Sequence, residues 1–494
     1  MESKVWTVAF QGLNVIDIEV QVHLTNGLPA FTIVGLPDKA VAESRERIRN
    51  ALHTMGLALP AQKITVNLSP ASVQKEGAHY DLPIALGVLS AMNVLPTDLC
   101  DYTAMGELGL DGSIRNVPGI LPGAFQSAQN KRKFICPHSA GSEAAWITNL
   151  DILAVPSLLS LVNFLKGTQV IIPPTPKVAP PQHKNADFKD IKGQHMARRA
   201  LEIAAAGGHN ILLVGPPGAG KSMLAERFPT ILPPLNPDEA LELSMIYSIA
   251  GLLPDGGLLK HRPFRDPHHS ASLPAIVGGG HRAQPGELSL AHKGVLFLDE
   301  MPEFARGALE ALRQPLESKK AVIARANAHV TYPADIQLVG AMNPCPCGYL
   351  GDAEKSCRKA PLCGETYQQK LSGPLLDRID IYVSVPAVSV ADLNTLKPGE
   401  ESASIKERVT HARAIQKKRK SHTLNAQLSN QQVETLSLLT VDAKNLLVEA
   451  AEKFRISARS YYRIMKVART IADLSASPQV DPIHMGEALQ YRRP

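Results

Sequence analysis

The 494-residue sequence predicts a chain of mixed α/β class in three parts: an α+β domain, an α/β core around a parallel sheet, and a helical C-terminal domain. Five prolines between positions 173 and 181 predict an extended linker after the first part. Beyond it, short apolar segments alternate with helical patterns, which favours parallel strands. From Ser402 the pattern is helical to the end. We therefore expect domains at 1–167, 190–395 and 396–494, with the linker at 168–189.

The composition supports a folded protein and excludes two classes. Apolar residues make up 44% of the chain and charged residues 20%, which is enough apolar material for several cores. A net charge of +6 is too mild for a protein that binds nucleic acid through a charged tail. No apolar segment follows Met1, and no run of about 18 apolar residues occurs. We therefore expect a cytoplasmic protein with neither a secretion signal nor a membrane span.

The first part carries the patterns of an α+β domain. Apolar and polar residues alternate over positions 16–22, as in a half-buried antiparallel strand. Asp38 is placed to cap a helical stretch that ends at Gly56, and residues 64–68 predict another strand. A further helix opens at residues 81–83, where the proline falls in the first turn and its missing N–H costs nothing.

The second part alternates strands and helices in the order of a parallel sheet. The spacing predicts helices over 194–206 and 222–227, and buried strands over 210–214, 295–298 and 336–342.

A glycine-rich turn joins the first of these strands to the helix at 222. It fits the pattern G-x-x-x-x-G-K-[ST] at every fixed position, in the strand–loop–helix context that this motif requires. Backbone N–H groups and the helix N-terminus would bind phosphates, Lys221 would reach the β- and γ-phosphates, and the Ser222 hydroxyl would bind Mg²⁺. The ATP-binding residues predicted here are Gly215, Pro216, Pro217, Gly218, Ala219, Gly220, Lys221 and Ser222.

Two acids follow the second buried strand, at Asp299 and Glu300. Asp299 is predicted to join Ser222 around Mg²⁺, and Glu300 to polarise water, which would distinguish ATP hydrolysis from nucleotide storage. Asn343 ends the third strand and is a candidate to orient the same water, although a plain turn residue is the alternative.

Two arginines are candidates to complete the site. Arg378 lies between Asp377 and Asp380, so it is either held in an ion pair there or inserted into the ATP site of a neighbouring subunit. Arg459, near the start of a helix over 460–474, is a candidate to contact the γ-phosphate from its own chain.

Together these elements resemble the AAA+ ATPases, and specifically the magnesium-chelatase-like ComM/YifB family of bacterial competence proteins. The resemblance spans the chain. It rests on FTIVGLP at 31–37, RPFRDPHH at 262–269, PGELSLAH at 285–292, NPCPCG at 343–348, SGPLLDRID at 372–380 and VARTIADL at 467–474.

The resemblance implies a hexameric ring motor in the bacterial cytoplasm. Such a motor would use ATP and Mg²⁺ to promote branch migration of DNA joints during transformation. Its partners would be branched or single-stranded DNA and recombination proteins. It also implies that Asn343 is the sensor-1 residue, Arg378 the finger acting on the neighbouring subunit and Arg459 the sensor-2 arginine.

Residues 321–332 look like the presensor hairpin of this clade. Lys319, Lys320 and Arg325 lie on or beside it, so the hairpin is either a phosphate contact in a ring pore or a solvated basic turn.

The N-terminal domain resembles the Lon-protease fold without its catalytic pair. His79 stands about where that family has its serine, and the segment 117–122, which matches its lysine segment, has no lysine. Without a nucleophile and its base we expect no proteolysis. The domain would be a scaffold or a DNA-contacting module.

Four clustered cysteines are candidate ligands of a structural zinc ion in an insertion over 345–363: Cys345, Cys347, Cys357 and Cys363. The resemblance would put a cysteine at the position of Lys359, which leaves the fourth ligand in doubt. Reduced thiols without metal are the alternative.

Residues 401–420 carry seven Lys and Arg against two Glu, a net of +5 (7 − 2) on one helix. This is either a solvated face or a DNA contact.

Three functions therefore compete. The leading hypothesis is an ATP-driven DNA translocase. The second is a chelatase-like or chaperone-like ATPase that acts on a protein partner, and the third is an adaptor whose Lon-like domain binds proteins without cutting them.

Overall fold

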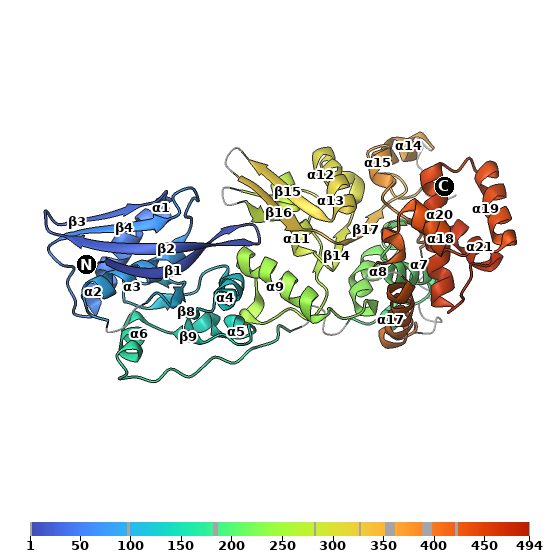
Figure 1. Ribbon diagram of the computed structural model, residues 1–494. Helices are drawn as coiled ribbons and strands as arrows, with labels where there is room; N and C mark the ends of the chain where they lie inside the picture. The colour runs from blue at the N-terminus through green and yellow to red at the C-terminus, as the bar shows by residue number, and fades with distance from the viewer. Residues whose placement is uncertain are drawn as a thin grey trace.

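A computed structural model describes residues 2–95, 99–180, 186–280, 283–325, 328–350, 361–387, 398–419 and 423–493. Figure 1 shows the N-terminal part in blue at one end, the core in the middle and the C-terminal helices in red at the other end. Within the described ranges, no helix is both long and apolar enough to cross a membrane.

The N-terminal part is built on a seven-stranded mixed sheet in the order β3-β4-β2-β1-β5-β8-β9. The predicted alternation over 16–22 is confirmed, because Ile18, Val20 and Val22 of β2 are fully buried and β2 pairs antiparallel with both neighbours. The strands are β1 (Glu2–Gln11), β2 (Asn14–Thr25), β3 (Ala30–Val34), β4 (Lys63–Ser69), β5 (Tyr102–Ala104), β8 (Lys133–Pro137) and β9 (Ile152–Val155).

The helices of this part begin where the sequence predicts. The Asp38 side chain accepts a hydrogen bond from the Val41 N–H at 2.7 Å and caps the first helix. The predicted stretch divides into two helices at Glu43. The helices are α1 (Lys39–Ala42), α2 (Ser44–Thr54), α3 (Asp81–Ala91), α4 (Ile120–Gln129), α5 (Gly141–Ala144) and α6 (Leu158–Leu165).

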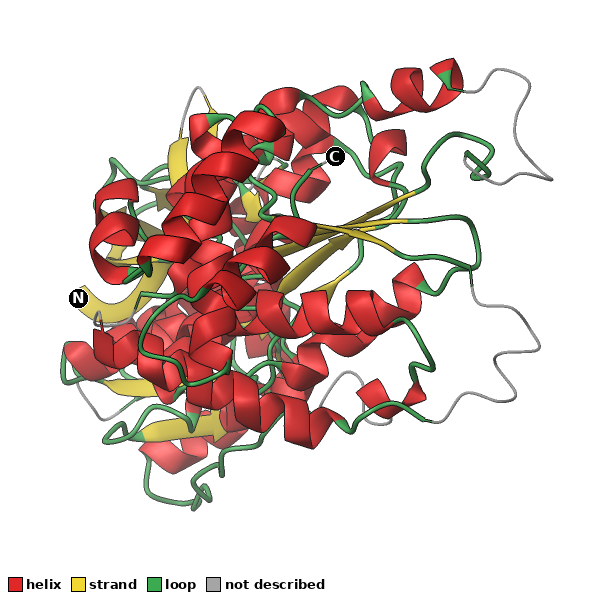
Figure 2. Ribbon diagram, turned by 90° about the vertical axis from the view of Figure 1, so that its right-hand side faces the viewer, coloured by secondary structure: helices red, strands yellow, loops and turns green. Residues whose placement is uncertain are grey.

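The core is a five-stranded parallel sheet in the order β11-β14-β17-β10-β18, as predicted for its three longest apolar segments. Alternate residues of β10 enter different clusters: Ile211 and Leu213 pack on one face and Leu212 on the other. Helices therefore cover both faces, as Figure 2 shows. The strands are β10 (Ile211–Val214), β11 (Phe264–Arg265), β14 (Val295–Leu298), β17 (Gln337–Met342) and β18 (Ile381–Ser384).

The core helices and hairpins surround this sheet. The helices are α7 (His195–Gly207), α8 (Lys221–Arg227), α9 (Pro237–Ala250), α10 (Leu273–Val277), α11 (Glu287–Leu290), α12 (Arg306–Ala311), α13 (Arg313–Ser318), α14 (Leu362–Gln368) and α15 (Gly373–Leu376). The hairpin predicted over 321–332 is confirmed as β15 (Lys320–Arg325) and β16 (Ala328–Pro333), and β12 (Gly278–Gly279) pairs with β13 (Gln284–Pro285).

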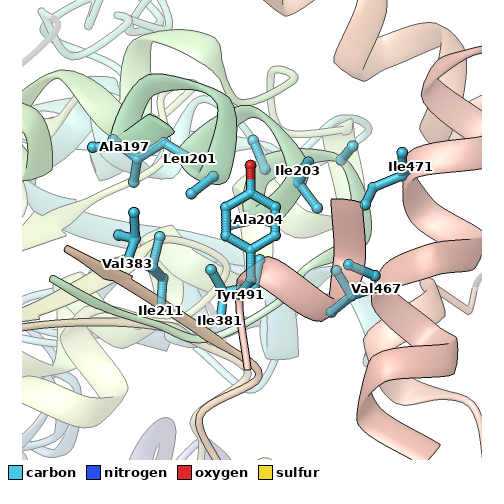
Figure 3. Packing of buried hydrophobic residues seen from close by; sticks show 14 of the residues in the cluster. Ala197, Leu201, Ile203, Ala204, Ile211, Ile381, Val383, Val467, Ile471 and Tyr491 are labelled. Atoms are coloured by element: carbon cyan, nitrogen blue, oxygen red, sulfur yellow. The ribbon is translucent and has the colours of Figure 1, made fainter. Parts of the chain in front are cut away.

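The C-terminal helices pack on one face of the core. In Figure 3, Tyr491 lies between Ile381 of the sheet, Ala204 of α7 and Val467 of α20, and all four belong to one buried cluster. The helices are α17 (Ser402–Arg419), α18 (Asn430–Leu436), α19 (Val441–Lys453), α20 (Ala458–Leu474) and α21 (Pro482–Gln490). The all-helical prediction from Ser402 is therefore confirmed, while the domain boundaries stay predictions.

A buried polar network joins the N-terminal part to α9 of the core. The Ser248 hydroxyl donates to Glu143 Oε1 at 2.5 Å, and the Leu121 N–H donates to the same oxygen at 2.9 Å. The Gly119 N–H donates to the Ser248 carbonyl at 3.0 Å. Burial raises the pKa of Glu143, although its two hydrogen bonds act in the opposite direction.

This network predicts a pH dependence of stability. Because the folded-state pKa of Glu143 is raised, its contribution is present below the unfolded value of about 4.3 and is lost as the pH rises through the folded-state value. Glu143→Gln keeps an acceptor oxygen and removes the charge. We expect its urea midpoint to fall less than that of the wild type between about pH 4.5 and about pH 8.

Tryptophan fluorescence can follow this unfolding, because Trp6 and Trp146 both lie in the N-terminal part. Glu449→Gln, an exposed position on α19, is the matched control. Identical pH profiles for wild type and Glu143→Gln would contradict the prediction.

Candidate nucleotide site

The glycine-rich loop runs from the carboxyl end of β10 to the start of α8. A Cβ atom on Gly215 would lie 2.1 Å from the Val385 carbonyl oxygen, so no larger residue fits there. Gly218 and Gly220 have φ values of 74° and 89°, which glycine adopts without strain. The loop conformation therefore depends on the three glycines of the motif.

Lys221 lies inside this loop. Its Nζ donates to the carbonyls of Gly215 and Pro216, both at 2.9 Å, and to Asn343 Oδ1 at 3.0 Å. Burial lowers the pKa of Lys221. The structure thus brings together the phosphate-binding lysine and the asparagine predicted at the end of the third strand.

The two residues predicted to bind Mg²⁺ are also adjacent. The Ser222 hydroxyl donates to Asp299 Oδ2 at 2.8 Å, and the other oxygen of Asp299 accepts from the Glu300 N–H at 2.8 Å. Glu300 has a φ of 48°, a left-handed conformation that is uncommon outside glycine. Hydroxyl and carboxylate oxygens are ligands that Mg²⁺ prefers, so this donor set fits the ion.

Sequence reasoning missed two residues of this site. His269 has its Nδ1 3.6 Å from Glu300 Oε2. Burial and the nearby carboxylate of Asp299 raise the pKa of Asp266. Both residues follow β11, the parallel neighbour of β14, and a two-residue strand gives too weak a pattern to be found in sequence.

Arg378 lies at the opposite edge of the sheet. It precedes β18, whose Ile381 pairs with Ile211 at the start of β10, and its carbonyl accepts from Asn210 Nδ2 at 2.8 Å. Arg378 Nη2 lies 2.5 Å from Glu317 Oε2. Of the two alternatives, the ion pair with Asp377 or Asp380 is not the one found, because a glutamate of α13 takes that place, and the role toward a neighbouring subunit stays a prediction.

Arg459 lies beside Arg378. Its Nη1 is 3.1 Å from Asp377 Oδ2, and Arg463 also pairs with Asp377. Asp377 lies at the amino edge of the sheet and the glycine-rich loop at the carboxyl edge, and contact of Arg459 with the γ-phosphate of its own chain stays a prediction. The side chain of Arg459 is 73% exposed at this edge.

The cysteine cluster is described only in part. Cys345 is buried, with its Sγ 3.1 Å from that of Cys347, too far for a disulfide. Cys363 lies in α14, and Cys357 falls outside the described residues. The described residues include no group of three or more ligands that would hold a metal, so they do not support zinc.

The basic helix uses part of its charge internally. On α17, Arg408 pairs with Glu202, Arg413 donates to the Ala205 carbonyl, and Arg419 pairs with Asp473. The local +5 is therefore a poor measure of the surface available to DNA. Lys417 and Lys418 are exposed, and Lys420 falls outside the described residues.

The predicted hairpin is half buried. Ile323 and Tyr332 face inward, while Lys320 is exposed. Lys319 Nζ lies 3.1 Å from Asp335, and the side chain of Arg325 falls outside the described part.

The segment around His79 lines a separate cavity. His79 is buried, and its Nε2 lies 2.8 Å from the Val8 carbonyl oxygen. The cavity has a volume of about 1170 Å³ and lies between this segment and the β15–β16 hairpin, where Val330 and Tyr332 line it.

The sheet order, the glycine-rich loop and the acids at the carboxyl edge define a P-loop protein of the AAA+ class with a helical lid. Family profiles agree: "Magnesium chelatase, subunit ChlI" matches 187–393, "Subunit ChlI of Mg-chelatase" matches 20–140, and "Magnesium chelatase, subunit ChlI C-terminal" matches 399–492.

Relatives that match over the full length define a narrower family than these profiles do. The chain is 43% identical to the competence protein ComM of Haemophilus influenzae, over 99% of this chain and 97% of that protein. It is also 43% identical to the protein YifB of Escherichia coli, with the same coverage. The magnesium-chelatase 67 kDa subunit of Chlorobaculum parvum is 31% identical over 32% of this chain and 23% of its own length. The chain belongs to the ComM/YifB family of magnesium-chelatase-like AAA+ proteins.

The contact between Ser222 and Asp299 predicts a metal-dependent affinity. Ser222→Ala should weaken binding of a fluorescent, non-hydrolysable ATP analogue about tenfold in Mg²⁺, because one metal ligand is lost. In EDTA the variant and the wild type should bind equally. Met223→Ala, at the exposed neighbouring position, is the control, and an equal loss in both buffers would refute the metal role.

Proposed function

We propose that this chain is an ATP-driven DNA translocase that promotes branch migration during transformation and recombination, working as a homohexameric ring in the bacterial cytoplasm. One observation supports a ring-shaped assembly. The phosphate-binding loop and Arg378 lie at opposite edges of one parallel sheet. A subunit therefore presents its arginine away from its own nucleotide, as a head-to-tail ring requires. The name of the Haemophilus relative supports the link to competence.

Each residue of the site then has a role. Lys221 binds the phosphates, Ser222 and Asp299 hold Mg²⁺, and Glu300 accepts a proton from the attacking water. Asn343 orients this water. Arg378 stabilises charge on the phosphates bound to the neighbouring subunit.

Arg459 would be the sensor-2 arginine that contacts the γ-phosphate from its own chain. The Lon-like N-terminal domain would be non-proteolytic, and the β15–β16 hairpin would contact DNA in the ring pore. Zinc in the segment 345–363 stays a prediction.

A second candidate is a chelatase-like ATPase that acts on a protein partner, favoured by the magnesium-chelatase profiles that match most of the chain. The two candidates differ in what stimulates hydrolysis. DNA would stimulate a translocase, whereas a protein would stimulate a chelatase-like ATPase.

Branch migration of a labelled Holliday or D-loop substrate tests the proposal. The wild type should migrate the joint with ATP, and DNA should stimulate its hydrolysis. Lys221→Ala should lose ATP binding, and Glu300→Gln should keep binding while losing hydrolysis by about 100-fold or more, because the general base is gone. Both should lose migration.

Glu303→Gln, which removes an exposed carboxylate paired with Lys370, is the matched control and should migrate normally. Hydrolysis that ignores DNA but rises with a protein partner would refute the translocase and favour the second candidate.

A further inference from the structure

A cavity of about 490 Å³ lies beside Arg378. It is formed by α13, the end of α12 and the turn that carries Arg378, at the amino edge of the sheet. Its lining residues are Glu310, Arg313, Gln314, Glu317, Ser318 and Arg378. Two guanidinium groups therefore share one cavity on the face opposite the chain's own nucleotide loop.

Both guanidinium groups keep hydrogen-bonding capacity. Arg378 donates from Nη1 to the Pro374 carbonyl at 2.9 Å and from Nη2 to Glu317 at 2.5 Å. Arg313 donates from Nη1 to Glu310 at 2.8 Å. The Nε atoms of both arginines are buried and have no hydrogen-bond partner in the described structure. An unpaired buried donor is unfavourable, so each arginine gains from an additional acceptor.

The glutamates are weak competitors for an anion. The carboxyl side chain of Glu317 is 72% exposed and that of Glu310 is 31% exposed. Ion pairs at such exposed sites are weak because water screens them, whereas a phosphate accepts two parallel charge-assisted bonds from an arginine.

We propose that Arg313 is a second arginine of the ring interface, which with Arg378 binds the terminal phosphates of ATP held by the neighbouring copy of this chain. The inference rests on the proposed function, because it needs a nucleotide on a second copy. Glu310 and Glu317 hold the two arginines extended toward the cavity in the free subunit and release them when the neighbour's phosphates arrive. The structure points to phosphates as the ligand because two convergent guanidiniums match a multiply charged anion.

The test compares three variants at position 313 and its neighbourhood. Arg313→Gln should lower the kcat of DNA-stimulated ATP hydrolysis about 100-fold, the usual loss when one charge-stabilising donor is removed. Arg313→Lys keeps the charge but cannot donate two parallel hydrogen bonds. Its kcat should therefore lie between those of Arg313→Gln and the wild type. Arg306→Gln on α12 removes an exposed arginine that does not line the cavity. Its kcat should stay within about twofold of the wild-type value.

Mixing subunits shows which copy Arg313 serves. Lys221→Ala subunits have an intact Arg313 and an inactive loop, and Arg313→Gln subunits have the reverse. Random mixing makes about one in four head-to-tail interfaces intact, so activity should recover to about a quarter of the wild-type value. Arg378→Ala mixed with Lys221→Ala should recover in the same way.

The outcomes separate this inference from the proposed function. If Arg313→Gln behaves like Arg306→Gln while Arg378→Ala is inactive, the ring mechanism stands and the second arginine is refuted. If Arg313→Gln is inactive and mixing restores only the Arg378 variant, Arg313 acts within its own chain and the inference is refuted. If neither arginine affects hydrolysis, the proposed ring mechanism fails, and the inference fails with it.

Discussion

The parallel pairing of β10 with β17 and β18 is the constraint on which the rest of the structure depends. All strands of such a sheet run the same way, so residues that follow the strands gather at one edge and residues that precede them at the other. The glycine-rich loop and Asp299 follow their strands. Arg378 precedes its strand. These groups therefore lie at opposite edges of one sheet, and the proposed ring would bring them together across two copies of the chain.

The same edge fixes the helical lid to the arginine turn. Asp377 pairs with Arg459 and Arg463 of α20, and Asp380 contacts His209, whose other ring nitrogen bonds Thr470 of α20 at 2.8 Å. Asp377 and Asp380, which flank Arg378 in the sequence, therefore contact α20 directly or through His209. A shift of α20 would therefore be transmitted through these contacts to the turn that carries Arg378.

The sequence predicts the parts of the site that are local along the chain. The positions of the loop at 215–222 and of the acids after β14 are predicted correctly, because a strand, its turn and the next helix form one continuous segment. The partner of Arg378 and the position of Arg459 were missed, because each depends on how segments about 60 and 80 residues apart pack together. His269 was missed because β11, the two-residue strand before it, gives too weak a pattern in the sequence. The net charge of +5 on α17 does not reveal which of its cations are exposed, since internal acids and carbonyls hold three of its arginines.

The hairpin beside the core shows how far this packing extends. A Cβ atom on Gly12, in the turn between β1 and β2, would lie 2.7 Å from a methyl carbon of Val330, so the turn sits directly on β16. Leu13 packs against the same cluster, which includes Ile323 and Tyr332. Part of the inner face of the hairpin therefore contacts the β1–β2 turn, and the outer face with Lys320 is exposed. Val330 and Tyr332 also line the cavity of about 1170 Å³ that separates the hairpin from the segment around His79. The N-terminal part thus touches the hairpin at the β1–β2 turn and leaves open space beside that contact.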